Sequence, residues 1–231
     1  MGIERVEQDG AAPVELERAR LEKLLIEAQN YVASRQLDLR GDLIGNEVVM
    51  SGHFIVTGDS GPFDSFQIEA SFTAGFPYVE PKVFETGGRI PKIADRHIYE
   101  GSGRCCTGVW EEAVLNPAVQ SLAGFMDVLV NDFFVSQTYY EANERWPYGD
   151  RSHGGLGVFE ACCDLLGIER EPRACVDMMA YLAGLPWKGH RPCMCGSGSR
   201  FRNCHRHHLD QVSQRVPQFA IIGLFRKLTA K

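Results

Sequence analysis

The sequence predicts an α+β fold in which helices pack against an antiparallel sheet. Three patterns indicate this class. Apolar residues recur every three to four positions between residues 21 and 32, as on one face of a helix. Segments 48–56 and 66–72 then alternate apolar and polar side chains, as half-buried strands do. Helical spacing returns after residue 120, so further helices follow the strands.

The first helix is expected after Pro13, and residues 1–14 are expected to form a flexible arm. Its apolar face comprises Leu21, Leu24, Leu25, Ala28 and Val32. The alternating apolar positions of the two strands are Val48, Met50, Gly52, Phe54 and Val56, then Phe66, Ile68, Ala70 and Phe72. A Gly/Pro turn at Gly58–Pro62 joins them, which predicts a meander.

The residues between Thr86 and Pro117 show neither the helical nor the strand periodicity of apolar side chains. This stretch contains five glycines and two prolines, together with His97, two adjacent cysteines and Trp110. A long irregular segment inside a compact domain is usually functional or disordered, and the aromatic and cysteine content argues against disorder. We therefore expect a functional loop here.

The later helices are expected at residues 122–133, 155–166 and 172–182. Pro172 suits the first turn of the last of these, and Gly184-Leu185-Pro186 ends it. Cys162 and Cys175 fall on apolar helix faces and are expected in the core, and no function is assigned to them or to Cys163.

Composition excludes several classes of protein. The 231 residues are 44% hydrophobic and 23% charged, which excludes disorder as the main state. The start lacks a signal-peptide pattern, and the apolar stretch Phe219–Phe225 is too short to span a bilayer, so a cytoplasmic protein with no membrane partner is expected. The net charge of −6 argues against nucleic acid as the partner of the main domain.

The eight cysteines all lie at or after residue 105. A small secreted domain stapled by disulfides would spread its cysteines through a short chain, whereas this chain is long enough for a conventional core. We expect a reducing compartment, with thiols used for metal binding or catalysis.

The C-terminal cysteines have the spacing of a metal site. Cys193-x-Cys195 is followed after eight residues by Cys204-His205, and this set supplies four soft or borderline ligands for tetrahedral zinc. Four protein ligands leave no open position, so the zinc is expected to be structural. His207 and His208 remain alternatives for the fourth ligand.

Residues 192–205 resemble the SEC-C motif, with its Cys-x-Cys-Gly-Ser-Gly and Cys-His elements. Its terminal pair is normally adjacent, which favours His205, and the motif is commonly a docking module. Between Lys188 and His208 there are five Lys or Arg, four His and no carboxylate. This basic patch suits an acidic protein surface or RNA phosphates, although charges that only solvate a small module remain an equal alternative.

The main domain resembles the ubiquitin-conjugating enzyme family. The resemblance rests on the order Phe76-Pro77, Pro81-Lys82-Val83, His97, Gly103-Arg104-Cys105-Cys106-Thr107 and Trp110. It covers residues 15–167 and implies a four-strand meander flanked by helices. Arg145-Trp146-Pro147-Tyr148-Gly149 and the segment 151–157 are similar to bacterial members from antiphage-type conjugation systems.

The resemblance implies that Cys106 is the catalytic cysteine, because Gly103 aligns with the motif glycine. Cys106 would carry a ubiquitin-like protein as a thioester, and Cys105 would point into or along the core. The partners implied are an activating enzyme, a ubiquitin-like or other thioester-linked protein, and a target protein with an amine. The alternative is that Cys105 and Cys106 are both buried structural cysteines with no catalytic role.

The sequence departs from the family at one functional element. His97-Ile98-Tyr99 stands where the family has His-Pro-Asn. In the family the asparagine stabilises the oxyanion, so in this chain that role is either unfilled or taken by Tyr99, His97 or backbone N–H groups. His153 is a further candidate for substrate positioning. Glu111 and Glu112 could help deprotonate an incoming lysine, although such glutamates more often face solvent.

The expected organisation is an arm at 1–14, a conjugating domain at 15–167, a helical connector at 168–187, a zinc module at 188–210 and a helical tail at 211–231. Two other functions remain open. The domain could be an inactive scaffold of the same fold, or a thiol redox protein that uses the Cys105–Cys106 pair. The redox alternative is weaker, because redox dithiols favour Cys-x-x-Cys spacing.

Overall fold

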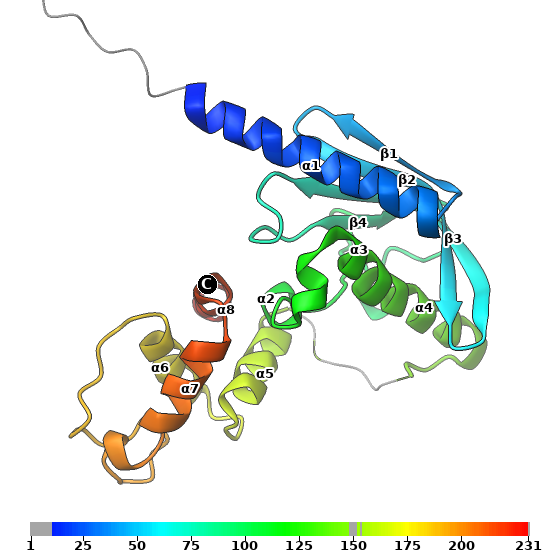
Figure 1. The fold of residues 1–231 in the computed structure, drawn as a ribbon. Helices are drawn as coiled ribbons and strands as arrows, with labels where there is room; N and C mark the ends of the chain where they lie inside the picture. The colour runs from blue at the N-terminus through cyan, green and yellow to red at the C-terminus, as the bar shows by residue number, and fades with distance from the viewer. Residues whose placement is uncertain (1–10, 148–151, 153, 231) are drawn as a thin grey trace, which may run out of the picture. The chain divides into compact units, whose positions relative to one another are not determined.

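The computed structural model describes residues 11–147, 152 and 154–230 (Figure 1). The chain forms two compact units. The first comprises the residues up to Thr107 together with Gln120–Pro147, and the second comprises Gly108–Val119 with the residues after 147. No helix in the described part of the chain combines the length and the apolar composition needed to cross a membrane.

The first unit contains a four-stranded antiparallel sheet with the strand order β1-β2-β3-β4. Its strands are β1 Leu39–Ile44, β2 Glu47–Gly58, β3 Gly61–Thr73 and β4 Lys82–Glu85. Helix α1, Ala11–Arg35, precedes the sheet. The α+β class and the antiparallel meander are therefore confirmed. Residues 11–14 belong to α1 and not to the expected arm, because a proline is tolerated in the first turn of a helix.

The core of this unit lies on one face of the sheet. In the β2–β3 register Met50 faces Ala70 and Phe54 faces Phe66, and all four side chains are buried. Phe134 packs on this face, with its ring centroid 4.6 Å from that of Phe66 and 6.0 Å from that of Phe54. The alternation in the sequence thus marks the buried face.

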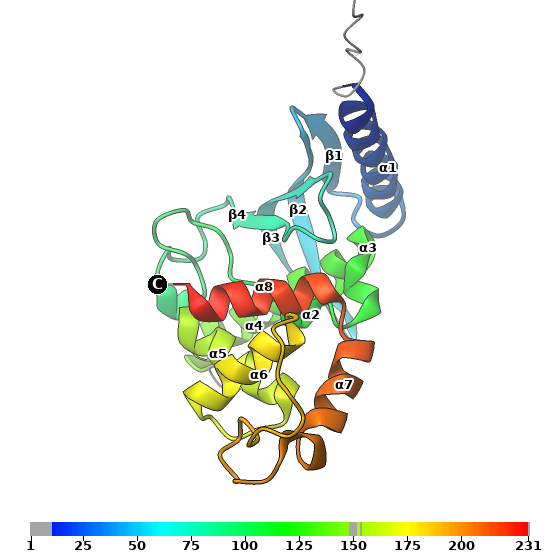
Figure 2. The same cartoon turned by 90° about the vertical axis from the view of Figure 1, so that its left-hand side faces the viewer.

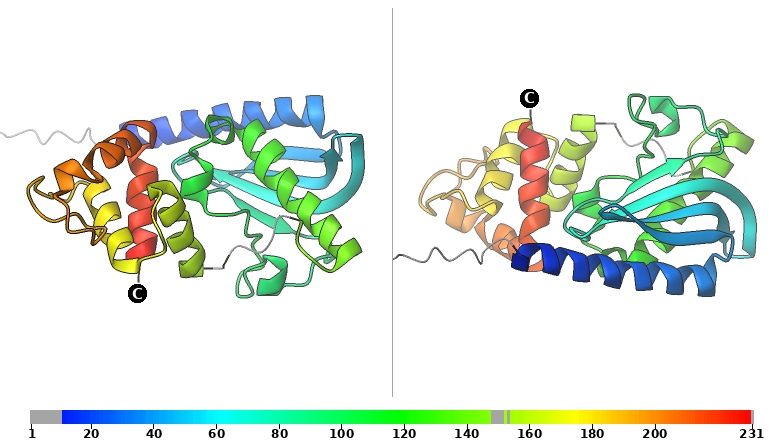
Figure 3. Two further views of the ribbon diagram at one scale, coloured as in Figure 1. Left: turned by 90° about the horizontal axis from the view of Figure 1, so that it is seen from below. Right: turned by 90° about the horizontal axis from the view of Figure 1, so that it is seen from above.

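The segment expected as one helix at 122–133 is longer and less regular. It comprises α3 Leu122–Gly124, a π-helical stretch Phe125–Val130 and α4 Asn131–Asn143, which runs obliquely to the strands (Figure 3). The π-helical stretch carries Asp127, whose carboxylate accepts a hydrogen bond of 2.9 Å from the Tyr31 hydroxyl and pairs with Arg35. Helix α1 is joined to this segment through these contacts.

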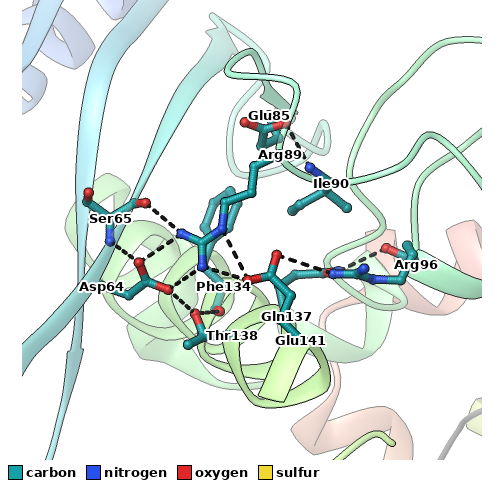
Figure 4. A network of polar contacts seen from close by, with 10 residues as sticks. All are labelled: Asp64, Ser65, Glu85, Arg89, Ile90, Arg96, Phe134, Gln137, Thr138 and Glu141. Atoms are coloured by element: carbon teal, nitrogen blue, oxygen red, sulfur yellow. Dashed lines mark hydrogen bonds and ion pairs between the residues drawn. The ribbon is translucent and has the colours of Figure 1, made fainter. Parts of the chain in front are cut away.

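The irregular segment after β4 is held in place by buried and half-buried charges (Figure 4). The Arg89 guanidinium donates to both carboxylate oxygens of Asp64 at 2.8 Å and to Glu141 at 2.6 Å. Arg96 donates to the side-chain oxygen of Gln137 at 2.8 and 3.0 Å, and the Gln137 amide donates back to the Arg96 carbonyl. These bonds order the residues that lead to His97, as the composition predicted for this loop.

Stability is expected to fall in acid partly through Asp64. Burial acts against the charged form, but the hydrogen bond from Arg89 outweighs it and lowers the Asp64 pKa from 3.8 to about 2. A depressed folded-state pKa stabilises the fold above the unfolded pKa, and this contribution is lost as pH falls from about 4 to about 2. The free energy of unfolding of Asp64→Asn should therefore depend less on pH in this window. An unchanged slope, measured by urea titration at several pH values, would contradict the assignment.

The second unit is a small helical assembly (Figure 2). Its helices are α2 Trp110–Ala113, α5 Gly154–Leu166, α6 Pro172–Leu182, α7 Arg206–Arg215 and α8 Gln218–Thr229. Helix α8 contacts α2, α5 and α6. We expected residues 155–166 to belong with the sheet, in a domain ending at 167. The contacts instead group α5 with α6 and α8, because its apolar face meets theirs.

Candidate functional site

The C-terminal cysteines and one histidine form a compact cluster in the second unit. The ligand atoms of Cys193, Cys195, Cys204 and His205 all lie within 4.8 Å of one another. His205 Nδ1 is 3.3 Å from Cys193 Sγ and 3.2 Å from Cys204 Sγ, and the sulfurs of Cys195 and Cys204 are 3.7 Å apart. These four residues could hold a metal ion.

The spacing fits a tetrahedral ion. Zinc bound at about 2.3 Å to sulfur and about 2.1 Å to nitrogen separates two sulfurs by about 3.8 Å and a sulfur from a nitrogen by about 3.6 Å. Three separations between ligand atoms, 3.7 Å between the sulfurs of Cys195 and Cys204 and 3.2–3.3 Å from His205 Nδ1 to two sulfurs, are close to these values. The donor set of three thiols and one imidazole is one that structural zinc sites use.

The local backbone explains why the cluster forms. The Cys193 N–H donates to the Ser199 carbonyl at 2.7 Å, which closes the Cys-x-Cys turn, and Pro192 pairs with Arg200. Gly196 and Gly198 have φ of 77° and 76°, in the left-handed region that favours glycine. The Gly-Ser-Gly element therefore lets a short chain bring both ends of the motif together.

The module is anchored to the helices by an aromatic contact and a hydrogen bond. Phe201 is fully buried, and its ring meets that of Tyr181 on α6 at 5.0 Å, edge to face. The Tyr181 hydroxyl donates to Asp210 on α7 at 2.9 Å. The metal-ligand segment is therefore packed against α6 and α7.

Two other histidines were alternatives for the fourth ligand, and both interact elsewhere. His208 Nε2 lies 2.8 Å from the Leu166 carbonyl, and His207 Nε2 lies 3.1 Å from the Gln211 side-chain amide. His205 stands directly before α7, with its ring among the three sulfurs. The geometry thus places His205 in the cluster, as the adjacent Cys-His pair suggested.

The thiols of the cluster differ in their electrostatics. Burial raises the pKa of Cys193. Burial also acts to raise the pKa of Cys195, but hydrogen bonds from the side chain and backbone of Ser197 and from the other two thiols lower it to about 6. Ser197 Oγ is 3.2 Å from Cys195 Sγ and 3.6 Å from Cys204 Sγ. Our sequence interpretation did not assign this serine a role, although it stands inside the Gly-Ser-Gly element.

The second candidate site is a tight hairpin in the first unit that carries Cys106. Ile98 pairs with Cys105, the Tyr99 N–H donates to the Arg104 carbonyl at 2.9 Å, and the Cys106 N–H donates to the His97 carbonyl at 2.7 Å. The Cys105 N–H donates to the Val83 carbonyl in β4 at 2.7 Å. The backbone of the hairpin is therefore fixed to the sheet.

This pairing separates the two adjacent cysteines. Because side chains alternate along an extended chain, Ile98 and Cys105 point to the core and are 3% and 2% exposed. Burial raises the pKa of Cys105 to about 12, so this thiol stays protonated at neutral pH. Cys106 is on the other side of the chain and is partly exposed.

Tyr99 lies on the same side of the hairpin as Cys106. Its hydroxyl donates to Cys106 Sγ at 3.6 Å, and the Arg104 guanidinium lies 4.7 Å from its ring centroid. Arg104 is in turn paired with Glu80 at 3.3 Å. The sequence did not single out Arg104 or Glu80, because their pairing depends on the fold of the hairpin.

The other sequence candidates have distinct environments. His97 has φ of 52°, and its ring meets that of Trp146 at 4.5 Å. Glu111 is only 8% exposed and accepts a hydrogen bond of 2.8 Å from Lys227 on α8, so its carboxylate is engaged within the second unit. Glu112 is partly exposed. His153 lies outside the described residues.

Comparison of the chain with protein-family models, with curated proteins and with solved structures finds no match.

Proposed function

We propose that this protein is a ubiquitin-conjugating-like enzyme that carries a ubiquitin-like protein as a thioester on Cys106. The observation that supports this most is the hairpin at residues 97–106. It buries one of two adjacent cysteines, leaves the other partly exposed, and places a phenolic hydroxyl 3.6 Å from the sulfur of the partly exposed one. An acyl carrier needs an accessible thiol that is held rigidly, and this hairpin provides one.

The reaction consists of two acyl transfers. The Cys106 thiolate attacks the thioester that joins the carrier protein to its activating enzyme, and the enzyme's thiolate leaves. The amine of a target then attacks the new thioester, Cys106 leaves as a thiolate, and the amine proton passes to solvent. The resemblance to bacterial members suggests a conjugation system of the antiphage type.

The metal of the Cys/His cluster is, in this proposal, a structural zinc ion. Cys193, Cys195, Cys204 and His205 are its ligands, and the closeness of their ligand atoms, all within 4.8 Å of one another, supports this assignment. Four protein ligands fill the coordination sphere, so the ion takes no part in acyl transfer. Its role is to fix the turn that leads into α7.

Replacing Cys106 with serine tests the enzymatic proposal. The chain is incubated with ATP, an activating enzyme and its ubiquitin-like protein, and adducts are resolved on gels with and without reductant. We expect the native chain to form an adduct that reductant removes. Cys106→Ser should instead form an oxyester that survives reductant, because oxygen replaces sulfur at the same position.

The matched control is Cys105→Ala, which alters the neighbouring cysteine and should leave charging intact, because Cys105 is buried. Charging that persists as a reductant-sensitive adduct in Cys106→Ser but disappears in Cys105→Ala would show that the wrong sulfur was chosen. If neither the native chain nor any variant is charged, the proposal fails.

A further inference from the structure

The Tyr99 hydroxyl is placed where charge develops during acyl transfer. It donates a hydrogen bond of 3.6 Å to Cys106 Sγ, the atom to which an acyl group would be attached. A thioester carbonyl carbon bonds directly to that sulfur, and its oxygen is one bond further. A donor that already reaches the sulfur is therefore within reach of the carbonyl oxygen after a small rotation of the side chain.

Several contacts fix this hydroxyl before any substrate binds. The Tyr99 backbone donates to the Arg104 carbonyl at 2.9 Å, and the Tyr99 carbonyl accepts from the Gly103 N–H at 2.7 Å. The Arg104 guanidinium lies 4.7 Å from the centroid of the Tyr99 ring and is itself paired with Glu80 at 3.3 Å. A donor that is positioned in advance costs little reorganisation in the transition state, which is the condition for effective electrostatic stabilisation.

The protonation and exposure of Tyr99 suit the same role. Burial, and to a lesser extent the hydrogen bond to Cys106, raise the Tyr99 pKa to about 12, so the phenol keeps its proton at neutral pH and remains a donor. The residue is nevertheless 43% exposed, so a bulky carrier can approach it. His97, the other side chain at this end of the hairpin, faces the Trp146 ring.

We propose that Tyr99 is a catalytic residue whose hydroxyl stabilises the oxyanion formed at the Cys106 thioester. This inference rests on the proposed function. When an amine attacks the thioester carbonyl carbon, an electron pair moves to oxygen, and Tyr99 donates its hydrogen bond to that oxygen. The carbonyl then re-forms, the C–Sγ bond breaks, Cys106 leaves as a thiolate, and water takes the proton of the amine.

The test uses a small acyl donor, so it does not depend on identifying the carrier. The full chain with its bound metal is loaded on Cys106 with the mercaptoethanesulfonate thioester of acetylglycylglycine, and the excess reagent is removed. Free lysine is then added, and loss of the acyl group is followed by intact mass, with its position on Cys106 confirmed by peptide mapping. Cys106→Ser gives the background from the other cysteines.

Tyr99→Phe should discharge at least tenfold more slowly than the native chain, because only the hydroxyl is lost and the ring still stacks with Arg104. Loading should slow less, because the hydrogen bond to the attacking thiolate also lowers its nucleophilicity. The matched control is Tyr139→Phe, which removes a hydroxyl that accepts a hydrogen bond from Arg145 elsewhere in the unit. This variant should discharge at the native rate.

Discharge of Tyr99→Phe within twofold of the native rate, with an unchanged melting temperature, would overturn the role of Tyr99. That result would leave the proposed function standing if the ATP-dependent assay with the carrier protein gives an adduct on Cys106. Slow discharge without ATP-dependent charging would instead retain Tyr99 as the oxyanion donor and reject the conjugating enzyme.

Discussion

We expect the native chain to bind a metal ion at the Cys/His cluster, and we expect replacement of Cys195 with serine to abolish most of that binding. The native chain should carry about one ion, and the variant much less, because a serine hydroxyl is a poor substitute for a thiolate ligand. Metal binding contributes directly to folding in small modules, with about 10–16 kcal/mol for zinc in isolated fingers. Metal content by atomic emission is the measurement.

If the cluster binds an ion as proposed, Cys195→Ser should also loosen the segment between Cys193 and His205. Arg200 and Arg202 are exposed beside the buried Phe201, so trypsin should cut the variant here faster than the native chain. Cys106→Ser is the matched control, because it removes another partly exposed thiol that lies outside the cluster, and its metal content should equal that of the native chain. An unchanged metal content in Cys195→Ser would refute the site.

Replacing Phe134 with alanine should strongly destabilise the first unit. The ring is fully buried and contacts the rings of Phe54, Phe66 and Phe133, at centroid distances of 4.6–6.0 Å. Its removal reduces the apolar surface buried in the core and leaves a cavity between α4 and the sheet. The expected loss is about 3–5 kcal/mol in the free energy of unfolding.

Hydrogen exchange of the β2 and β3 amides reports on this unit separately from the helical unit and provides the measurement. The control is Phe63→Ala, since Phe63 is 52% exposed near the start of β3 and should change the free energy by about 0.5 kcal/mol or less. Equal effects of the two substitutions would show that Phe134 is not a core residue.

The sequence predicted the regular elements well where a single period governed them. The alternation at residues 48–56 and 66–72 marked β2 and β3, and Pro172 together with a helical period marked the start of α6. The prediction was wrong where local packing altered the geometry. The π-helical stretch Phe125–Val130 has the same apolar spacing as an α-helix, so no sequence period distinguishes it.

The Cys/His cluster was predictable because it is local. Its four candidate ligands lie within 13 residues, and glycine and cysteine spacing alone restrict how such a short chain can fold. The division into two units was not predictable in this way. Helix α5 has an apolar face that could have covered the sheet, and only the tertiary structure shows that it packs with α6 and α8.

The sequence by itself determined the long helices, strands β2 and β3 and the Cys/His cluster, because periodicity and short-range spacing encode local structure. The tertiary structure decided which residues meet across long separations. It buried Cys105 and left Cys106 partly exposed, set the Tyr99 hydroxyl against the Cys106 sulfur, and paired Glu111 with Lys227. Such pairings depend on strand register and on how packed faces complement one another. Neither can be predicted from the residues of a single segment of the chain.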